Sequence, residues 1–179
     1  LNNPFSNPIA GILSAMGLLK GLLSILVTIG VLANGSSTYN VLYSLGDSFF
    51  YFMPVLLAYT ASKKFGLSEI TGLLIGVSLL YPYLIKGAEA DVSTIFGIAI
   101  QMPASGDYST SVIPIIISVW FASKIEKAIK TKMPESIKLF AVPFVVLTIT
   151  FIATILIIGP VASYAANVLG KVAVAIYNF

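Results

Sequence analysis

The chain has no cysteine and no histidine among its 179 residues. Without these side chains it can form no disulfide, offer no thiolate or imidazole to a metal ion, and carry no phosphocysteine or phosphohistidine. Arginine is also absent, so the ten basic residues are all lysine. Charged residues make up only 9% of the sequence, whereas about 25% is usual in a soluble domain. This scarcity of charge excludes an ordinary soluble domain, and the net charge of +3 gives no nucleic-acid-binding patch.

Apolar residues fill most of the sequence instead. They account for 58% of the chain and give a mean hydropathy of +0.98. Several runs approach the roughly 20 residues that a helix needs to cross about 30 Å of hydrocarbon, whereas a cleavable signal peptide has a single shorter run. We therefore predict an all-α, polytopic membrane protein. The length suits one domain or half of a large transporter, and the start at Leu1 leads us to expect an excised piece.

Turn-forming and charged residues divide the chain into apolar segments. We predict five membrane-spanning helices, at about residues 8–32, 40–60, 68–85, 108–122 and 137–161. The fourth should continue as helix into the lysines that follow it, and Gly159 with Pro160 should end the fifth. An interfacial helix is expected at about 164–178, where polar residues recur at helical spacing. Residues 1–179 would thus form a single membrane domain.

The long connection at 86–107 contains an apolar, β-branched run at 92–101 that is too short to span a membrane. A short hairpin or a buried re-entrant segment would satisfy its backbone polar groups. The acidic residues around it, Glu89, Asp91 and Asp107, are expected in a solvated outer loop.

Lysine placement predicts the orientation. Lys63 and Lys64 lie in the second connection, and the fourth region carries five more lysines: Lys124, Lys127, Lys130, Lys132 and Lys138. The first connection has no charge, and the third has Lys86 against three acids. Since positive charge favours the cytoplasmic side, the N-terminus should be cytoplasmic and the C-terminal end outside.

Two charges fall well inside predicted spans. At 1.5 Å per residue, Lys20 lies about 18 Å from the outer end of the first helix and Asp47 about 10 Å from that of the second. Adjacent antiparallel helices would leave them roughly 8 Å apart in height, which an extended lysine can largely cover. We interpret them as a candidate ion pair, either structural or part of a gate, wet cavity or substrate contact.

The first span also carries a stripe of small side chains at alternating spacings of four and three residues. Its members are Ala10, Ser14, Gly17, Gly21, Ser24 and Thr28. Small residues let helix backbones approach closely in a membrane, so we predict a helix-packing face. Pro54 should kink the second span and free a carbonyl. Tyr51 and its aromatic neighbours could line a sugar path, or contact lipid and other helices.

No catalytic, cofactor-binding or metal-binding motif is present. The sequence has no glycine-rich phosphate loop, no metal-ligand spacing and no serine hydrolase elbow.

Several motifs together resemble one family, the enzyme IIC permeases of bacterial sugar phosphotransferase systems in the glucose superfamily. They are GLLKGLL at 17–23, GDSFFYFMP at 46–54, LAYTASKKFG at 57–66, YSTSVIPII at 108–116, Trp120 and IGP at 158–160. The sequence is most similar to the β-glucoside, sucrose and trehalose branch, with β-glucosides the first choice.

The resemblance implies a homodimeric permease of about ten spans in the bacterial cell membrane. Such a permease moves a sugar inward while a phosphorylated IIB domain, supplied through HPr and IIA, transfers phosphate to it. In the family the second half holds the main sugar site, with a Gly-Ile-Thr-Glu motif and a histidine, and neither is present here. This chain would then be the first half, the scaffold and dimer-interface part of a sugar phosphotransferase, with no phosphoryl-carrying residue of its own.

Two alternatives stay open at this point. The chain could be a complete small membrane protein, such as an oligomeric scaffold or channel subunit, in which the small-residue stripe drives association. It could also be half of an unrelated secondary transporter with Lys20 and Asp47 on an ion path.

Overall fold

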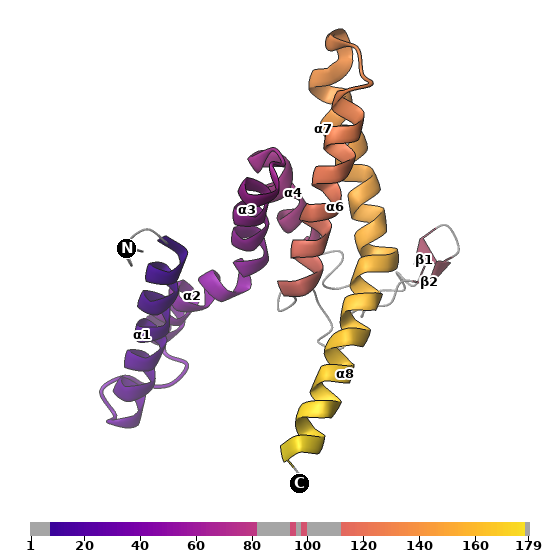
Figure 1. Cartoon of the computed structure of the whole chain (residues 1–179). Coiled ribbons are helices and arrows are strands. Elements are labelled where there is room, and N and C mark those ends of the chain that lie inside the picture. The colour runs from indigo at the N-terminus through magenta and orange to yellow at the C-terminus, as the bar shows by residue number, and fades with distance from the viewer. Residues whose placement is uncertain (1–7, 82–93, 96–97, 100–111, 178–179) are drawn as a thin grey trace, which may run out of the picture. The chain divides into compact units, whose positions relative to one another are not determined.

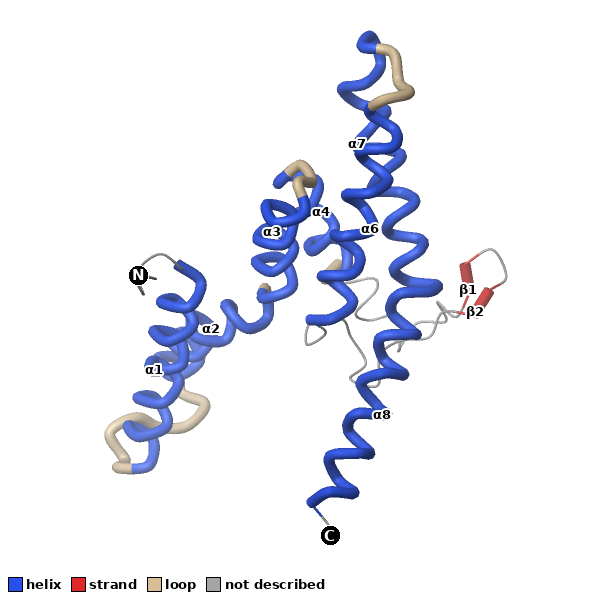
Figure 2. The backbone as a smooth tube through the Cα atoms, in the orientation of Figure 1, coloured by secondary structure: helices blue, strands red, loops and turns tan. Residues whose placement is uncertain are grey.

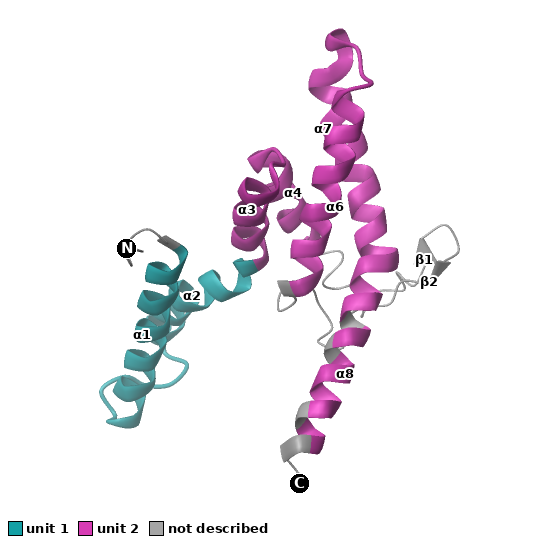
Figure 3. Cartoon of the chain, viewed as in Figure 1, with its two compact units in different colours: residues 1–53 teal, residues 54–179 magenta. Residues whose placement is uncertain are grey.

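The computed structural model describes residues 8–81, 94–95, 98–99 and 112–177, and these residues are almost entirely helical (Figures 1 and 2). The chain divides into two compact units, Leu1–Met53 and Pro54–Phe179 (Figure 3).

The first unit is built from two helices, α1 (Pro8–Thr28) and α2 (Ser37–Tyr51), which pack against each other. Gly30 and Gly35, with φ of 78° and 76°, turn the chain between them. Ser36 then starts α2, because its hydroxyl accepts a hydrogen bond from Tyr39 N–H at 3.2 Å. Leu23, 2% exposed, is the buried centre of the α1 face that meets α2.

The second predicted span is interrupted as Pro54 suggested. Helix α2 ends at Tyr51 with Phe52 as its C-cap, and α3 (Met53–Phe65) begins immediately after it. Pro54 has no N–H to donate to the preceding turn, so the helical hydrogen-bond pattern breaks at this point. Residues 37–65 remain almost wholly helical on both sides of the break.

In the second unit, α3 and α4 (Glu69–Leu79) approach each other very closely. A Cβ atom placed on Gly76 would lie 2.7 Å from Val55 Cα and 3.1 Å from Ala58 Cβ. Only glycine fits at such a crossing. Residues from α3 and α4 consequently share one apolar core with α6 and α7.

The turn between α3 and α4 is held by α6 (Val112–Lys130). Glu126 Oε2 accepts a hydrogen bond from Ser68 N–H at 3.1 Å, and Lys127 Nζ donates to Phe65 C=O at 3.2 Å. These contacts satisfy a free N–H at the start of α4 and a free carbonyl at the end of α3. Gly66, with φ of 70°, makes the turn.

Helix α6 extends from the predicted fourth span through its lysines to Lys130, as expected, and packs against α7 (Glu135–Ala153). Val119, Val142 and Val146 are at most 3% exposed in this interface. Directly after α7, a hydrogen bond between two buried hydroxyls continues the contact with α6, with Thr154 Oγ1 lying 2.7 Å from Ser118 Oγ. The hydroxyls of Ser118 and Thr154 also bond to carbonyls of the preceding helical turn, those of Pro114 and Thr150. Thr150 Oγ1 is the exception, a buried hydroxyl without a partner among the described residues.

The helix does not end at Gly159 and Pro160, contrary to our expectation. A π-helical segment, Thr154–Ile158, leads directly into α8 (Gly159–Tyr177). Gly159 N–H donates to Thr154 C=O, five residues back. This wider turn accommodates a proline that would clash with a regular α-helical turn. A separate helix at 164–178 is therefore not observed among the described residues, because this segment is the continuation of α8.

The described part of the long connection contains a two-stranded antiparallel hairpin, β1 (Thr94–Ile95) and β2 (Ile98–Ala99), in which Ile95 pairs with Ile98. This corresponds to the hairpin alternative of the prediction. The expected outer-loop acids Glu89, Asp91 and Asp107 lie outside the described residues.

Three helices in the described segments are long and apolar enough to cross a membrane: Ile9–Thr28, Ser37–Phe65 and Glu135–Val172. The last, at 38 residues, is about 57 Å long, so it extends beyond about 30 Å of hydrocarbon. Large apolar side chains face outward along the helices, for example Leu18 at 75% and Phe144 at 68% exposure. A soluble protein does not expose such continuous apolar surface, so the chain is a polytopic helical membrane protein.

Gly76 offers a direct test of the α3–α4 crossing. Gly76→Ala should lower the free energy of unfolding by about 1–3 kcal/mol, because the added methyl group meets backbone that cannot move aside. Thermal unfolding in detergent, followed by circular dichroism, measures the change. Gly170→Ala on α8 is the matched control, since no atom lies within 4 Å of the added methyl group. Equal stability of the two variants would contradict the close crossing.

Candidate functional site

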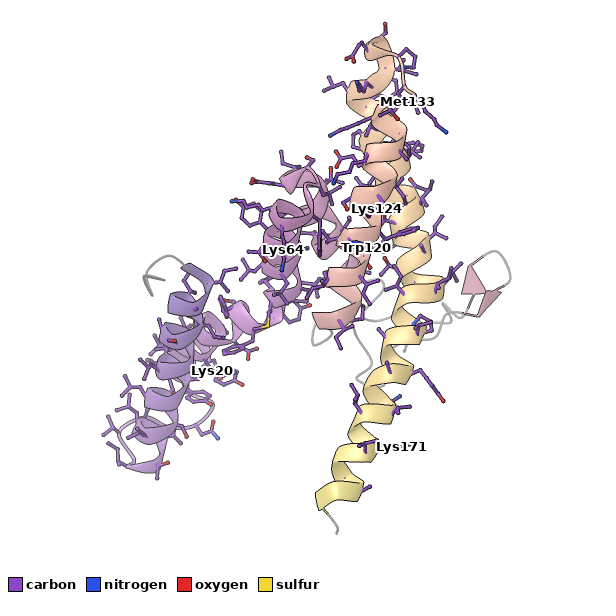
Figure 4. The ribbon with its side chains drawn as sticks, in the orientation of Figure 1. Lys20, Lys64, Trp120, Lys124, Met133 and Lys171 are labelled. Atoms are coloured by element: carbon purple, nitrogen blue, oxygen red, sulfur yellow. The ribbon has the colours of Figure 1, made fainter. Side chains whose placement is uncertain are left out.

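The candidate site lies where α1 crosses α2, at the two charges expected to meet within the membrane. Lys20 is on the α1 face that contacts α2, one turn before the buried Leu23 (Figure 4). Gly46 precedes Asp47 on α2 and is buried against the lysine. A Cβ atom on Gly46 would lie 2.8 Å from Lys20 Cγ, so the glycine makes room for the lysine stem.

Lys20 and Asp47 form an ion pair. Lys20 Nζ lies 2.7 Å from Asp47 Oδ1, a hydrogen-bonded distance. The side chains keep 30% and 46% of their surfaces exposed, respectively. The pair is therefore a half-open contact at the edge of the α1–α2 interface.

Two aromatic rings complete the surroundings of the ammonium group. Lys20 Nζ lies 4.6 Å from the centre of the Tyr43 ring and 5.2 Å from that of Phe50. These residues lie four before and three after Asp47, on the same face of α2. Each ring can stabilise the cation by about 0.5–2 kcal/mol, the larger values applying away from water.

This arrangement is suited to holding charge in an apolar environment. An ionised lysine or aspartate at the centre of a membrane helix costs about 2.5–3.5 kcal/mol. The direct pair and the ring faces offset part of that cost and bind α1 to α2. The outward-facing side of the carboxylate could also accept a hydrogen bond from a polar molecule, so the geometry allows both a structural and a contact role.

Sequence reasoning missed Gly46, Tyr43 and Phe50 as members of this site. The helical spacing of the two rings about Asp47 was a usable signal. Tyr51, considered for a sugar path, contacts Phe52 edge to face, with ring centres 5.1 Å apart. It is 39% exposed, and its role stays a prediction.

The small-residue stripe does not form the α1 face that meets α2. The hydroxyls of Ser14 and Thr28 bond to carbonyls of their own helix, those of Ala10 and Ser24. A Cβ atom on Gly17 or Gly21 would have no neighbour within 4 Å. The stripe is thus an open surface of the first unit, and its helix-packing role stays a prediction.

Within residues 8–81, 94–95, 98–99 and 112–177, no group of three or more acidic side chains could hold a metal ion. In the first unit, the candidate functional groups are the Lys20–Asp47 ion pair and its aromatic neighbours.

Comparison with known proteins identifies the family. The model of the family described as "Phosphotransferase system, EIIC" matches residues 4–178. The chain is 40% identical to the PTS system beta-glucoside-specific EIIBCA component of Halalkalibacterium halodurans, over 96% of this chain and 29% of that protein. It is 37% identical to the component of the same name from Dickeya chrysanthemi, over 90% of this chain and 26% of the relative.

A third relative has a different sugar in its name. The chain is 30% identical to the probable PTS system sucrose-specific EIIBC component of Bacillus subtilis, over 96% of this chain and 38% of that protein. No solved structure matches the chain. The chain spans less than a third of the length of the two β-glucoside relatives. With nearly all of its residues matched, the chain belongs to the EIIC family of the phosphotransferase system.

Proposed function

We propose that this chain is part of a permease that transports a sugar by group translocation, most specifically a β-glucoside. The match to the EIIC family across residues 4–178 is the observation that carries this proposal. The two relatives named for β-glucosides are 40% and 37% identical, against 30% for the sucrose-specific protein. The same match disfavours an unrelated scaffold, channel or secondary transporter.

The composition of the chain indicates that other domains carry the phosphate. The chain has neither histidine nor cysteine, so phosphate carried on such residues must come from other domains. The partners we propose are a phosphorylated IIB domain, with IIA and HPr upstream of it, and a second copy of the permease. This chain supplies the N-terminal, helix-packing half of the permease.

The placement in the membrane is part of the proposal. We assign the chain to the bacterial plasma membrane with a cytoplasmic N-terminus. The lysines support this orientation, because Lys63 and Lys64 lie in the last turn of α3 and Lys127 in the last turn of α6, where it bonds to Phe65 C=O. A IIB domain that brings phosphate would approach the same cytoplasmic side.

Uptake by the intact permease tests the function. Cells that carry it should accumulate a radiolabelled β-glucoside only as the phosphorylated sugar, and membrane vesicles should require phosphoenolpyruvate for uptake. Sucrose and trehalose, supplied in parallel, serve as the sugar controls. Accumulation of unmodified β-glucoside would contradict group translocation, and exclusive uptake of sucrose or trehalose would contradict the sugar assignment.

The proposed role of the ion pair is structural. Lys20→Ala and Asp47→Ala should each cost about 2–3 kcal/mol, because each leaves one charge unpaired in the membrane. The loss should reduce the yield of monodisperse protein more than the sugar affinity of what remains. Size-exclusion chromatography and sugar-binding measurements separate these effects.

A double variant, Lys20→Met with Asp47→Leu, removes both charges and should recover most of the yield. Lys171→Ala, at an exposed lysine of α8, is the control and should behave as the unaltered protein. Normal yield with lost sugar binding in the single variants would show a contact or gate role instead.

A further inference from the structure

A groove in the second unit has the features of a lipid-headgroup site. It lies among α4, α6 and α7, and its volume of about 550 Å³ is within the range of ligand pockets. The connection around Met133, labelled in Figure 4, joins α6 to α7 at this end of the helices. One part of the groove is lined by charged side chains and the other by apolar ones.

The charged part holds two lysines and two glutamates. Lys130 Nζ lies 2.6 Å from Glu126 Oε1, and Lys138 Nζ lies 2.6 Å from Glu135 Oε1. Glu126, 5% exposed at its side chain, also accepts the Ser68 N–H, so its role is to hold α4 to α6. Glu135 is 87% exposed and presents its carboxylate outward. The rim thus offers both signs of charge and has no net charge.

The apolar part continues directly from this rim. Leu139 follows Lys138 and is 90% exposed, and Ile70 on α4 is 73% exposed. Val142, one helical turn or about 6 Å beyond Lys138, forms the buried floor of the groove at 3% exposure. Leu74, 43% exposed, lies one turn beyond Ile70 on α4 and also lines the groove. Charged groups at one level, with exposed aliphatic groups beside them and one turn deeper, match the boundary between headgroups and acyl chains.

We propose that this groove binds a zwitterionic phospholipid whose headgroup has a primary ammonium, the chemistry of phosphatidylethanolamine. Lys138 and Lys130 face the phosphate, Glu135 accepts hydrogen bonds from the ammonium, and Ile70 and Leu139 contact the acyl chains. When Lys138 pairs with the phosphate in place of Glu135, the Glu135 carboxylate can pair with the ammonium. Each charge then keeps an opposite partner.

Because the rim has equal numbers of positive and negative charges, it should distinguish between classes of lipid headgroup. A purely anionic headgroup would compete with two carboxylates and leave Glu135 without a cation. A trimethylated ammonium has the charge but no N–H to donate, so it loses the hydrogen bonds to Glu135. The site should therefore prefer the primary amine.

Native mass spectrometry of the full chain in detergent tests the preference on the unaltered protein. Phosphatidylethanolamine, its mono- and dimethylated forms, phosphatidylcholine and phosphatidylglycerol are added with identical acyl chains. Affinity should fall with each methyl group, to about threefold to tenfold weaker for phosphatidylcholine. Phosphatidylglycerol binding as tightly as phosphatidylethanolamine, or no difference along the methyl series, would overturn the proposal.

Variants locate the site. Glu135→Gln should abolish the difference between phosphatidylethanolamine and phosphatidylcholine, and Lys138→Gln should weaken both. Lys132→Gln is the matched control, because Lys132 lies in the same connection but does not line the groove. A preference that survives Glu135→Gln, or that Lys132→Gln removes equally, would overturn the assignment to this groove. The methyl series decides the lipid class even if a variant folds poorly.

Discussion

The structure depends on one constraint, that polar groups within an apolar environment must find partners inside the chain. The backbone meets it by forming helices, and hydroxyls such as those of Ser14 and Thr28 bond to carbonyls of the preceding turn. Lys20 meets it through Asp47 and two aromatic rings. Even the α3–α4 turn has its free N–H and C=O groups bonded by Glu126 and Lys127. Because these groups have partners, the few charged and polar side chains of the chain can lie among its apolar segments.

Glycine marks the places where helices come closest, and the open glycines mark a surface that is still free. Gly46 and Gly76 lie against neighbouring side chains or backbone that leave no room for a methyl group. Gly17 and Gly21, in contrast, face open space. A first half that packs its own helices through one set of glycines, and keeps another set exposed, fits the scaffold role proposed for this part of an EIIC permease.

The sequence predicted features that depend on local rules. The depths of Lys20 and Asp47 along two antiparallel helices predicted that they could pair, and they do. Pro54 predicted the break between α2 and α3, and the lysines after residue 122 predicted the extension of α6 as a helix. The predicted helix end at Gly159 and Pro160 was wrong, because a π-helical turn removes the clash that would end a regular helix. The aromatic rings around Lys20 were missed although their helical spacing about Asp47 was a usable signal. The groove at α4, α6 and α7 depends on packing between helices, which spacing along the sequence does not determine.

The orientation of the helices in the membrane is the most direct test of the whole account. The chain contains no cysteine, so single substitutions can be labelled without background from it. Ser36→Cys in the first connection and Thr131→Cys between α6 and α7 would be treated with a membrane-impermeant maleimide in intact cells. The account predicts labelling of Ser36→Cys at once and of Thr131→Cys only after the membrane is permeabilised. Labelling of Thr131→Cys in intact cells, with Ser36→Cys protected, would contradict it.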